Sequence, residues 1–196
     1  MPRRSDAKPR MVAAARRLFR QRGYVATAFS DVLEASEAPR GSVYFHFPGG
    51  KEELGVEVAL LHLAELIAEV NRAALRARTP AELIEAFVDA SRRGLVASDY
   101  REGCAVAPII IETTPDSAQL TAVTSRGVRD IVATLAARLT EKGVPADAAT
   151  PLAVATVAGT QGALIVARSL RDDSPFDAVR DALAAQATAA LPSPAD

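Results

Sequence analysis

One stretch of the chain, residues 27–51, constrains the fold more than any other, because two short helical segments flank a tight turn there. Pro39 cannot continue the first segment, but it suits the first turn of a second helix. That second helix, about residues 40–45, is too short to be stable alone in water. Neighbouring segments must hold it, and we expect Val43 and Phe47 to be its inward anchors.

Apolar residues along the whole chain recur mostly at spacings of three and four, which is the period of a buried helix face. Alanine and leucine, both strong helix formers, dominate the composition. We therefore predict an all-α protein of about nine helices. The run Thr-Pro-Ala-Glu at 79–82 predicts a capped helix start. In segment 104–112, three isoleucines also suit a buried strand, but a short helix after Pro108 is favoured because no partner strand is apparent.

Charge divides the chain into a basic first part and an acidic remainder. Residues 1–51 hold ten basic and four acidic side chains, a net charge of +6, whereas the whole chain carries −1. This division suggests a polyanion-binding head on a body that does not bind polyanions. Chance clustering on a solvated face is the alternative. We predict two domains, a DNA-binding head at residues 1–50 and a helical body at residues 51–196.

Two short helices around a tight turn have the layout of a helix-turn-helix, whose second helix enters the major groove of DNA. The second helix here would expose Arg40, Ser42, Tyr44 and His46. Lys51 opens the following helix, where a cation opposes the helix dipole. A DNA phosphate beside it would reverse that cost, because helix-terminal N–H groups and a lysine bind the same anion.

Residue groups that bind metals or catalyse reactions are not evident. His46 and His62 are far apart, and no cysteine or carboxylate cluster has metal-ligand spacing. Cys104 is the single cysteine and has no histidine near it in sequence, so we expect a core position, with redox sensing as the alternative. Residues 48–51 lack the first glycine of a P-loop. We therefore predict no metal, no cofactor and no enzymatic activity.

The sequence favours a cytoplasmic protein. No apolar run approaches about 20 residues, the length of a membrane-spanning helix, so we expect no contact with a membrane. The N-terminus lacks the apolar region of a secretory signal. A single cysteine suits a reducing compartment.

The run LFRQRGYVATAFSDVLEASEAPRGSVYFHFPGGKEEL, residues 18–54, resembles the N-terminal domain of TetR-type (tetracycline-repressor-like) transcriptional regulators. The shared elements are LF-x3-GY-x-x-T, the Asp-Val-Leu helix, the Pro-Arg-Gly-Ser turn, Val-Tyr-Phe-His-Phe and Lys-Glu-Glu-Leu. Gly103-Cys104 before a short apolar helix, and GALIVAR at 162–168, resemble the LmrA/YxaF-type subgroup. This resemblance implies a nine-helix protein that dimerises through its last two helices and has a small-molecule cavity in its body.

The same resemblance implies that residues in and around the helix-turn-helix contact DNA, namely Thr27, Arg40, Gly41, Ser42, Tyr44, Phe45, His46 and Lys51. Arg40 is the best candidate for base reading, since arginine fits a guanine edge bidentately. Thr27 would bind phosphate or cap its helix. Phe45 stands where relatives commonly have a polar residue, and it either touches a thymine methyl or packs. Ser30 replaces a longer polar or basic residue, so one contact is expected to be absent.

The alternatives for the other two rings are structural. Tyr44 would be a core aromatic instead of a phosphate ligand, and His46 would be a helix C-cap.

The last two predicted helices, about 147–170 and 174–191, are apolar enough that a single chain would struggle to cover them. Gly159, Gly162 and Ala163 would let another helix approach closely. We therefore predict a homodimer built on a four-helix interface. The predicted interface residues are Leu152, Leu164, Phe176, Val179 and Leu183.

Together these features predict a ligand-responsive transcriptional repressor that binds a double-stranded palindromic operator. A helical small-molecule carrier or enzyme with a basic head is the alternative. An apolar cavity would take a lipophilic or aromatic effector. The candidate cavity residues are Leu63, Ile67, Phe87, Cys104, Ile109, Ile110, Gln161 and Ile165.

Overall fold

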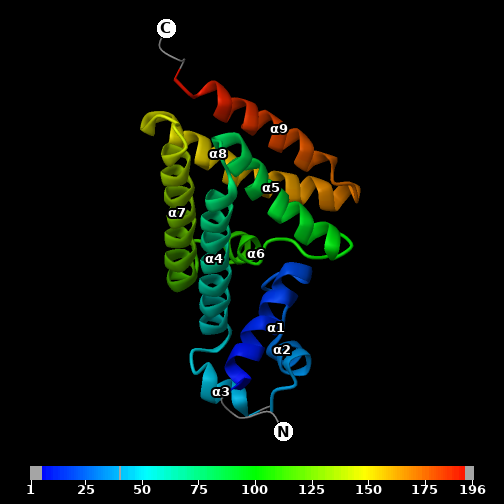
Figure 1. Cartoon of the computed structure of the whole chain (residues 1–196). Coiled ribbons are helices and arrows are strands. Elements are labelled where there is room, and N and C mark those ends of the chain that lie inside the picture. Colours follow the sequence, from blue (N-terminus) through cyan, green and yellow to red (C-terminus); the bar gives the residue numbers. More distant parts are fainter. Residues whose placement is uncertain (1–5, 40, 193–196) are drawn as a thin grey trace. The chain divides into compact units, whose positions relative to one another are not determined.

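The structure is a computed structural model that describes residues 6–39 and 41–192, with the backbone alone for Ser42 and Tyr44. Every regular element in these residues is helical, which confirms the all-α prediction (Figure 1). The helices are α1 Ala7–Arg22, α2 Phe29–Ser36, α3 Ser42–His46, α4 Gly50–Arg76, α5 Pro80–Ala97, α6 Val106–Thr113, α7 Ala118–Glu141, α8 Ala146–Leu170 and α9 Ser174–Ala189.

Local sequence signals explain most of these boundaries. Gly23 ends α1 with φ at 94°, a left-handed region that glycine occupies without strain. Thr79 caps α5, because its hydroxyl accepts a hydrogen bond from the Glu82 N–H at 3.1 Å. Segment 104–112 forms the short helix α6 rather than a strand, with Pro108 in its first turn.

The start of α2 differs from the prediction. Its N-cap is Ala28, and the Asp31 carboxylate accepts a hydrogen bond from the Ala28 N–H at 2.9 Å. Thr27 does not cap this helix, because its hydroxyl donates instead to the Gly23 carbonyl at 2.8 Å. The threonine therefore closes the turn that precedes α2.

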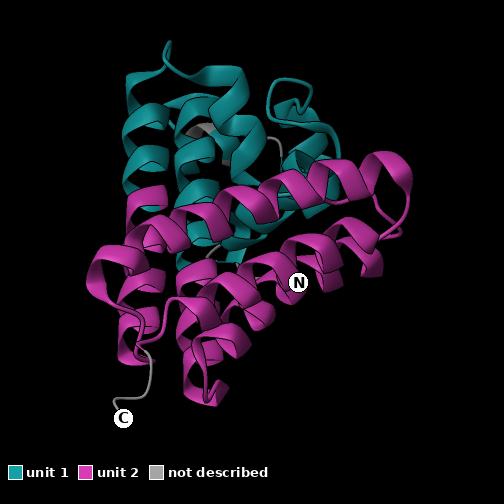
Figure 2. Ribbon diagram, turned by 90° about the horizontal axis from the view of Figure 1, so that it is seen from above, with its two compact units in different colours: residues 1–64, 104–127 teal, residues 65–103, 128–196 magenta. Residues whose placement is uncertain are grey.

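The chain divides into two compact units, residues 1–64 with 104–127, and residues 65–103 with 128–196 (Figure 2). Helices α4 and α7 each contribute to both units. This geometric division does not follow the predicted boundary after residue 50. The functional division at that residue concerns DNA and effector binding, and it stays a prediction.

The first unit contains α1 to α3, and its core fixes the helix-turn-helix. Phe19 of α1 and Val32 of α2 are fully buried, and α1 packs against α2. Val43 and Phe47, the predicted anchors of the short third helix, are 7% and 0% exposed. Tertiary burial thus stabilises a five-residue helix that would not form alone.

The second unit is built on α5, α8 and α9, which pack against one another. Phe176 of α9 is completely buried. Gly159 of α8 lets α9 approach closely, since a Cβ there would lie 3.0 Å from Cγ1 of Val179. Among the described residues, α8 alone is long and apolar enough to cross a membrane by length and composition. One third of its most apolar stretch is buried within the chain.

Candidate nucleic-acid interface

The short helix α3 carries half of the eight residues predicted to contact DNA. Arg40, the predicted base reader, lies outside the described residues, and Ser42 and Tyr44 are placed by backbone alone in α3. Gly41 is the N-cap of α3 and is exposed, and a Cβ added to it would meet nothing within 4 Å. Open space in front of this glycine leaves room for a partner to approach the backbone.

Phe45 lies in solvent rather than in the core. It is 81% exposed, and its ring meets the His46 ring edge-on with centroids 4.9 Å apart. Exposing a phenylalanine on a five-residue helix gains nothing for folding. His46 is the last residue of α3, and the C-cap is Phe47, so the alternative role of His46 as a C-cap is wrong.

Thr27 is not available to a phosphate in this structure. The residue is 1% exposed, and its hydroxyl donates to the Gly23 carbonyl. The predicted phosphate role therefore conflicts with burial, because a hydroxyl inside the turn cannot reach a DNA backbone.

Lys51 is engaged by the chain itself. Its ammonium donates a hydrogen bond to the Val25 carbonyl at 3.0 Å and lies 4.6 Å from the centre of the Tyr24 ring. Burial lowers the pKa of Lys51, while the negative charges of Glu112 and Asp31 act in the opposite direction. The sequence predicted a lysine poised for phosphate, whereas the structure shows one that ties the start of α4 to the turn after α1.

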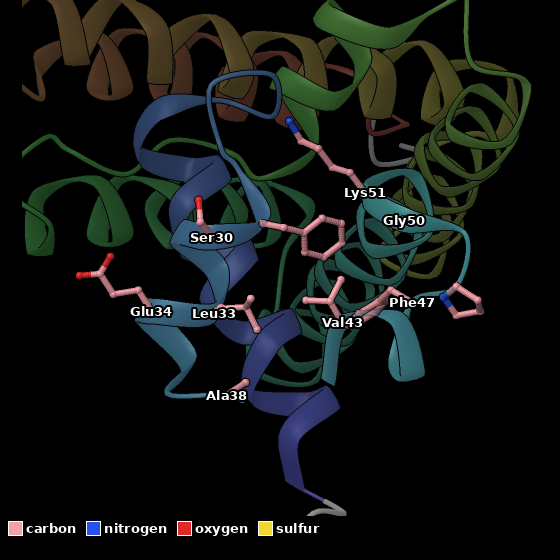
Figure 3. Close-up of a pocket in the computed structure, with 10 residues that line it drawn as sticks. Ser30, Leu33, Glu34, Ala38, Val43, Phe47, Gly50 and Lys51 are labelled. Carbon is pink, nitrogen blue, oxygen red and sulfur yellow. The ribbon is translucent and has the colours of Figure 1, made fainter. Parts of the chain in front are cut away.

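An open groove of about 840 Å³ runs between α2 and the α3–α4 region. Leu33 and Val43 face each other across it, whereas Glu34 points away (Figure 3). Ser30 and Lys51 also line the groove. Ser30 is exposed on α2, so its short side chain leaves this face without the longer polar group expected from relatives.

Most of the predicted dimer residues are buried within the chain, so their assignment is wrong. Leu152, Leu164, Phe176 and Leu183 are between 0% and 9% exposed. Val179 is half-buried and faces Gly159 of α8. The prediction failed because α5, α8 and α9 pack against one another within the chain, where these side chains are buried.

A different face of α8 and α9 is apolar and exposed. On α8, Val154 is 49% exposed and Ile165 is 65% exposed, and nothing lies within 4 Å of a Cβ added to Gly162. On α9, four exposed alanines recur at helical spacing, namely Ala178, Ala182, Ala185 and Ala189. Sequence periodicity indicated that α8 is apolar on all sides. It did not indicate which side packs against other helices of the same chain and which side stays exposed.

The predicted cavity residues differ in their surroundings. Leu63, Phe87 and Ile109 are buried, whereas Ile67, Cys104, Ile110 and Gln161 are partly exposed. Ile165 is 65% exposed on the α8 face, which argues against a role as an interior wall. The cavity itself stays a prediction.

Cys104 has a histidine neighbour that sequence distance concealed. Its Sγ lies 3.5 Å from Nε2 of His62, 42 residues away along the chain. Within residues 6–39 and 41–192, no group of three or more His, Cys, Asp or Glu side chains is arranged to hold a metal. The pair is therefore a local contact between α4 and the start of the α6 segment.

Two family models match the chain. Residues 11–58 match the model of bacterial regulatory proteins of the tetR family, and residues 80–182 match the C-terminal domain of LmrA/YxaF-like transcriptional regulators. The first match covers α1 to α3 and the start of α4, and the second covers α5 to α8 and the first half of α9. These matches confirm both the family and the subgroup suggested by the sequence.

Whole-chain comparisons agree with the family models. An uncharacterized HTH-type transcriptional regulator of Mycobacterium tuberculosis is 38% identical over 94% of this chain and 96% of its own length. The HTH-type transcriptional regulator LmrA of Bacillus subtilis is 28% identical over 87% of this chain and 91% of its own. In fold, the chain is similar to the crystal structure of a regulatory protein TetR from Rhodobacter sphaeroides, with a TM-score of 0.83, 19% identity and coverage of 92% and 98%.

TetR-family regulators bind DNA and act as dimers. On the similarity of its sequence over nearly its whole length, this chain belongs to the TetR family of transcriptional regulators, in the LmrA/YxaF-like group.

Proposed function

We propose that the protein is a repressor that binds a palindromic operator as a homodimer and is released by a lipophilic small molecule. The observation that supports DNA binding is the position of Phe45. Its side chain is 81% exposed on α3, and it lies in a segment, residues 1–51, with a net charge of +6. An apolar ring in a basic segment suits the floor of a major groove, where thymine methyl groups are the apolar feature. Arg40 and Ser42, which adjoin Gly41 in the sequence, are proposed to make the polar contacts to base edges.

The dimer brings two copies of α3 to one operator. Helix-turn-helix dimers bind half-sites about 34–36 Å apart, so the operator repeats the two-fold symmetry of the protein. The exposed α8–α9 face, with Val154, Gly162 and Ile165, is our candidate for the contact between copies. Its small residues allow close helix approach, and its branched residues supply the apolar area that a stable dimer needs.

The effector is proposed to be lipophilic or aromatic and to act on a cytoplasmic protein. Seven of the eight predicted wall residues remain candidates, and five of these, Leu63, Ile67, Phe87, Ile109 and Ile110, are apolar. A ligand releases DNA only if it binds one conformation of the dimer more tightly than the other. The repressor assignment therefore requires that effector and operator weaken each other's binding.

Selection of DNA by the wild-type protein from a random-sequence duplex library tests this proposal. We expect a palindrome to emerge, with an affinity that falls steeply with salt. Arg40→Ala should cost about 1–3 kcal/mol and relax base preference at one position of each half-site. Enrichment of no sequence, or of a site without symmetry, would contradict the proposal.

A further inference from the structure

The turn between α1 and α2 is held from two sides by groups distant in sequence. Oε2 of Glu112, near the end of α6, accepts a hydrogen bond from the Val25 N–H at 2.6 Å, across 87 residues. The ammonium of Lys51, at the start of α4, donates to the carbonyl of the same Val25 at 3.0 Å. Two helices thus hold the two polar backbone groups of one residue. We call this arrangement the Val25 clamp.

The turn is shaped to admit the carboxylate. Gly23 has φ at 94°, and a Cβ there would lie 2.6 Å from Oε1 of Glu112. The next residue, Tyr24, is 8% exposed and packs edge-on against Phe19 of α1 with ring centroids 5.2 Å apart. The clamp therefore acts on a segment that is rigidly joined to α1.

The clamp is not part of the hydrophobic core. Glu112 is itself exposed, and Val25 and Ile111 beside it are 65% and 74% exposed. Burial of α6 comes from Val106 and Ile109 instead. A charge-assisted hydrogen bond between solvent-exposed groups contributes little to the free energy of unfolding. The main effect of the Glu112 bond is therefore to fix the conformation of the turn at Val25.

We infer that Glu112 is a positioning residue for DNA binding, through which α6 fixes the turn that carries α2 and α3. This inference rests on the proposed DNA-binding function and adds a residue that positions the turn before α2. Helix α6 packs against α1, and the clamp adds a directional link from its last turn to Val25. Loss of the Glu112 carboxylate would leave the turn with the Lys51 bond alone.

The test compares Glu112→Ala and Glu112→Gln with Asp116→Asn. Asp116 is an exposed carboxylate four positions along the chain, so its amide variant controls for loss of charge nearby. The probe is the palindromic duplex selected by the wild-type protein. We expect the alanine variant to bind it about tenfold more weakly, because DNA binding must then order a turn that has lost one of its two restraints. The glutamine variant keeps an acceptor and should lose about threefold. Asp116→Asn should bind as the wild type does.

A second readout reports the clamp without DNA. Hydrogen exchange at the Val25 amide, followed by NMR on valine-labelled protein, should be at least about tenfold faster in Glu112→Ala, while amides in the helix cores keep their protection. Unchanged Val25 exchange, or wild-type operator affinity in the alanine variant, would overturn the inference. If the wild type selects no DNA, the proposed function fails, and Val25 exchange still decides whether the clamp exists.

Discussion

Phe45 is the residue whose position is hardest to explain by folding. Its ring is 81% exposed on a helix of five residues. Phe45→Ala should therefore leave the free energy of unfolding within about 0.5 kcal/mol of the wild type. It should weaken binding to the selected duplex by roughly fivefold to tenfold, about 1–1.4 kcal/mol, because an apolar base contact is lost.

Leu75→Ala is the matched control for Phe45→Ala. Leu75 is 88% exposed at the end of α4, outside the helix-turn-helix, so its truncation should change neither stability nor affinity. Chemical denaturation and fluorescence anisotropy measure the two quantities. Destabilisation by Phe45→Ala without loss of affinity would show that the ring packs in solution.

Tyr24 gives the turn a dependence on pH. Burial and the negative charge of Glu52 raise the pKa of its phenol above the ordinary 10.0. The folded chain favours the protonated phenol. The stability that this preference contributes is therefore fully present below the pKa of Tyr24 in the unfolded chain, and it is lost as pH rises through the pKa of Tyr24 in the folded chain. Lys51 changes stability in the opposite direction. Burial disfavours its charged ammonium and lowers its pKa from the ordinary 10.5, so the folded chain gains stability as rising pH removes that charge.

Urea unfolding between about pH 9 and about pH 11 separates the two groups. Tyr24→Phe removes the phenol and retains the ring, so its stability should fall less steeply with pH than that of the wild type. Parallel curves for the two proteins would mean that Tyr24 does not titrate differently in the folded state.

At the scale of the elements, breakers, caps and apolar spacing predicted nearly everything that is local. Pro39, Thr79 and Gly23 mark helix boundaries within a few residues, and Val43 and Phe47 are anchors as expected. These signals act within one or two turns of the chain, so sequence carries them directly.

Apart from Thr27, whose hydroxyl bonds to Gly23 four residues away instead of capping α2, the failures involve contacts between distant residues. The partner of Lys51 is 26 residues away, and that of Cys104 is 42 residues away. The covered face of α8 depends on how α5 and α9 pack against it, which periodicity alone does not specify. For the same reason, buried side chains such as Phe176 were mistaken for an interface between chains.

The ion pairs that join α5 and α9 provide a test at this scale. Arg92 donates to Asp173 at 2.6 Å and to Asp177 at 2.8 Å. Arg92→Ala should lower the free energy of unfolding by about 1 kcal/mol, and by less at high salt. Arg93→Ala, at an exposed position on the same helix, should be nearly neutral. Equal effects of both changes in thermal unfolding would mean that only helix propensity is being measured.

At the scale of the whole molecule, the exposed α8–α9 face predicts how copies associate. Ile165→Asp places a charge on that face, and burying an unpaired charge between helices is unfavourable. We expect the variant to sediment as a monomer while its circular dichroism stays helical. Leu75→Asp introduces the same charge at a residue that is 88% exposed, and it should remain dimeric. A dimeric Ile165→Asp protein would place the interface elsewhere.

The stoichiometry of the DNA complex shows whether two chains act together on one operator. Sedimentation of the wild-type protein with the selected palindrome, and with a duplex that carries only one half-site, measures how many chains bind each. We expect two chains on the palindrome, with much weaker binding to the half-site, because two copies of α3 read the two half-sites together. Tight binding of a single chain to the half-site, or no difference between the two duplexes, would contradict this expectation.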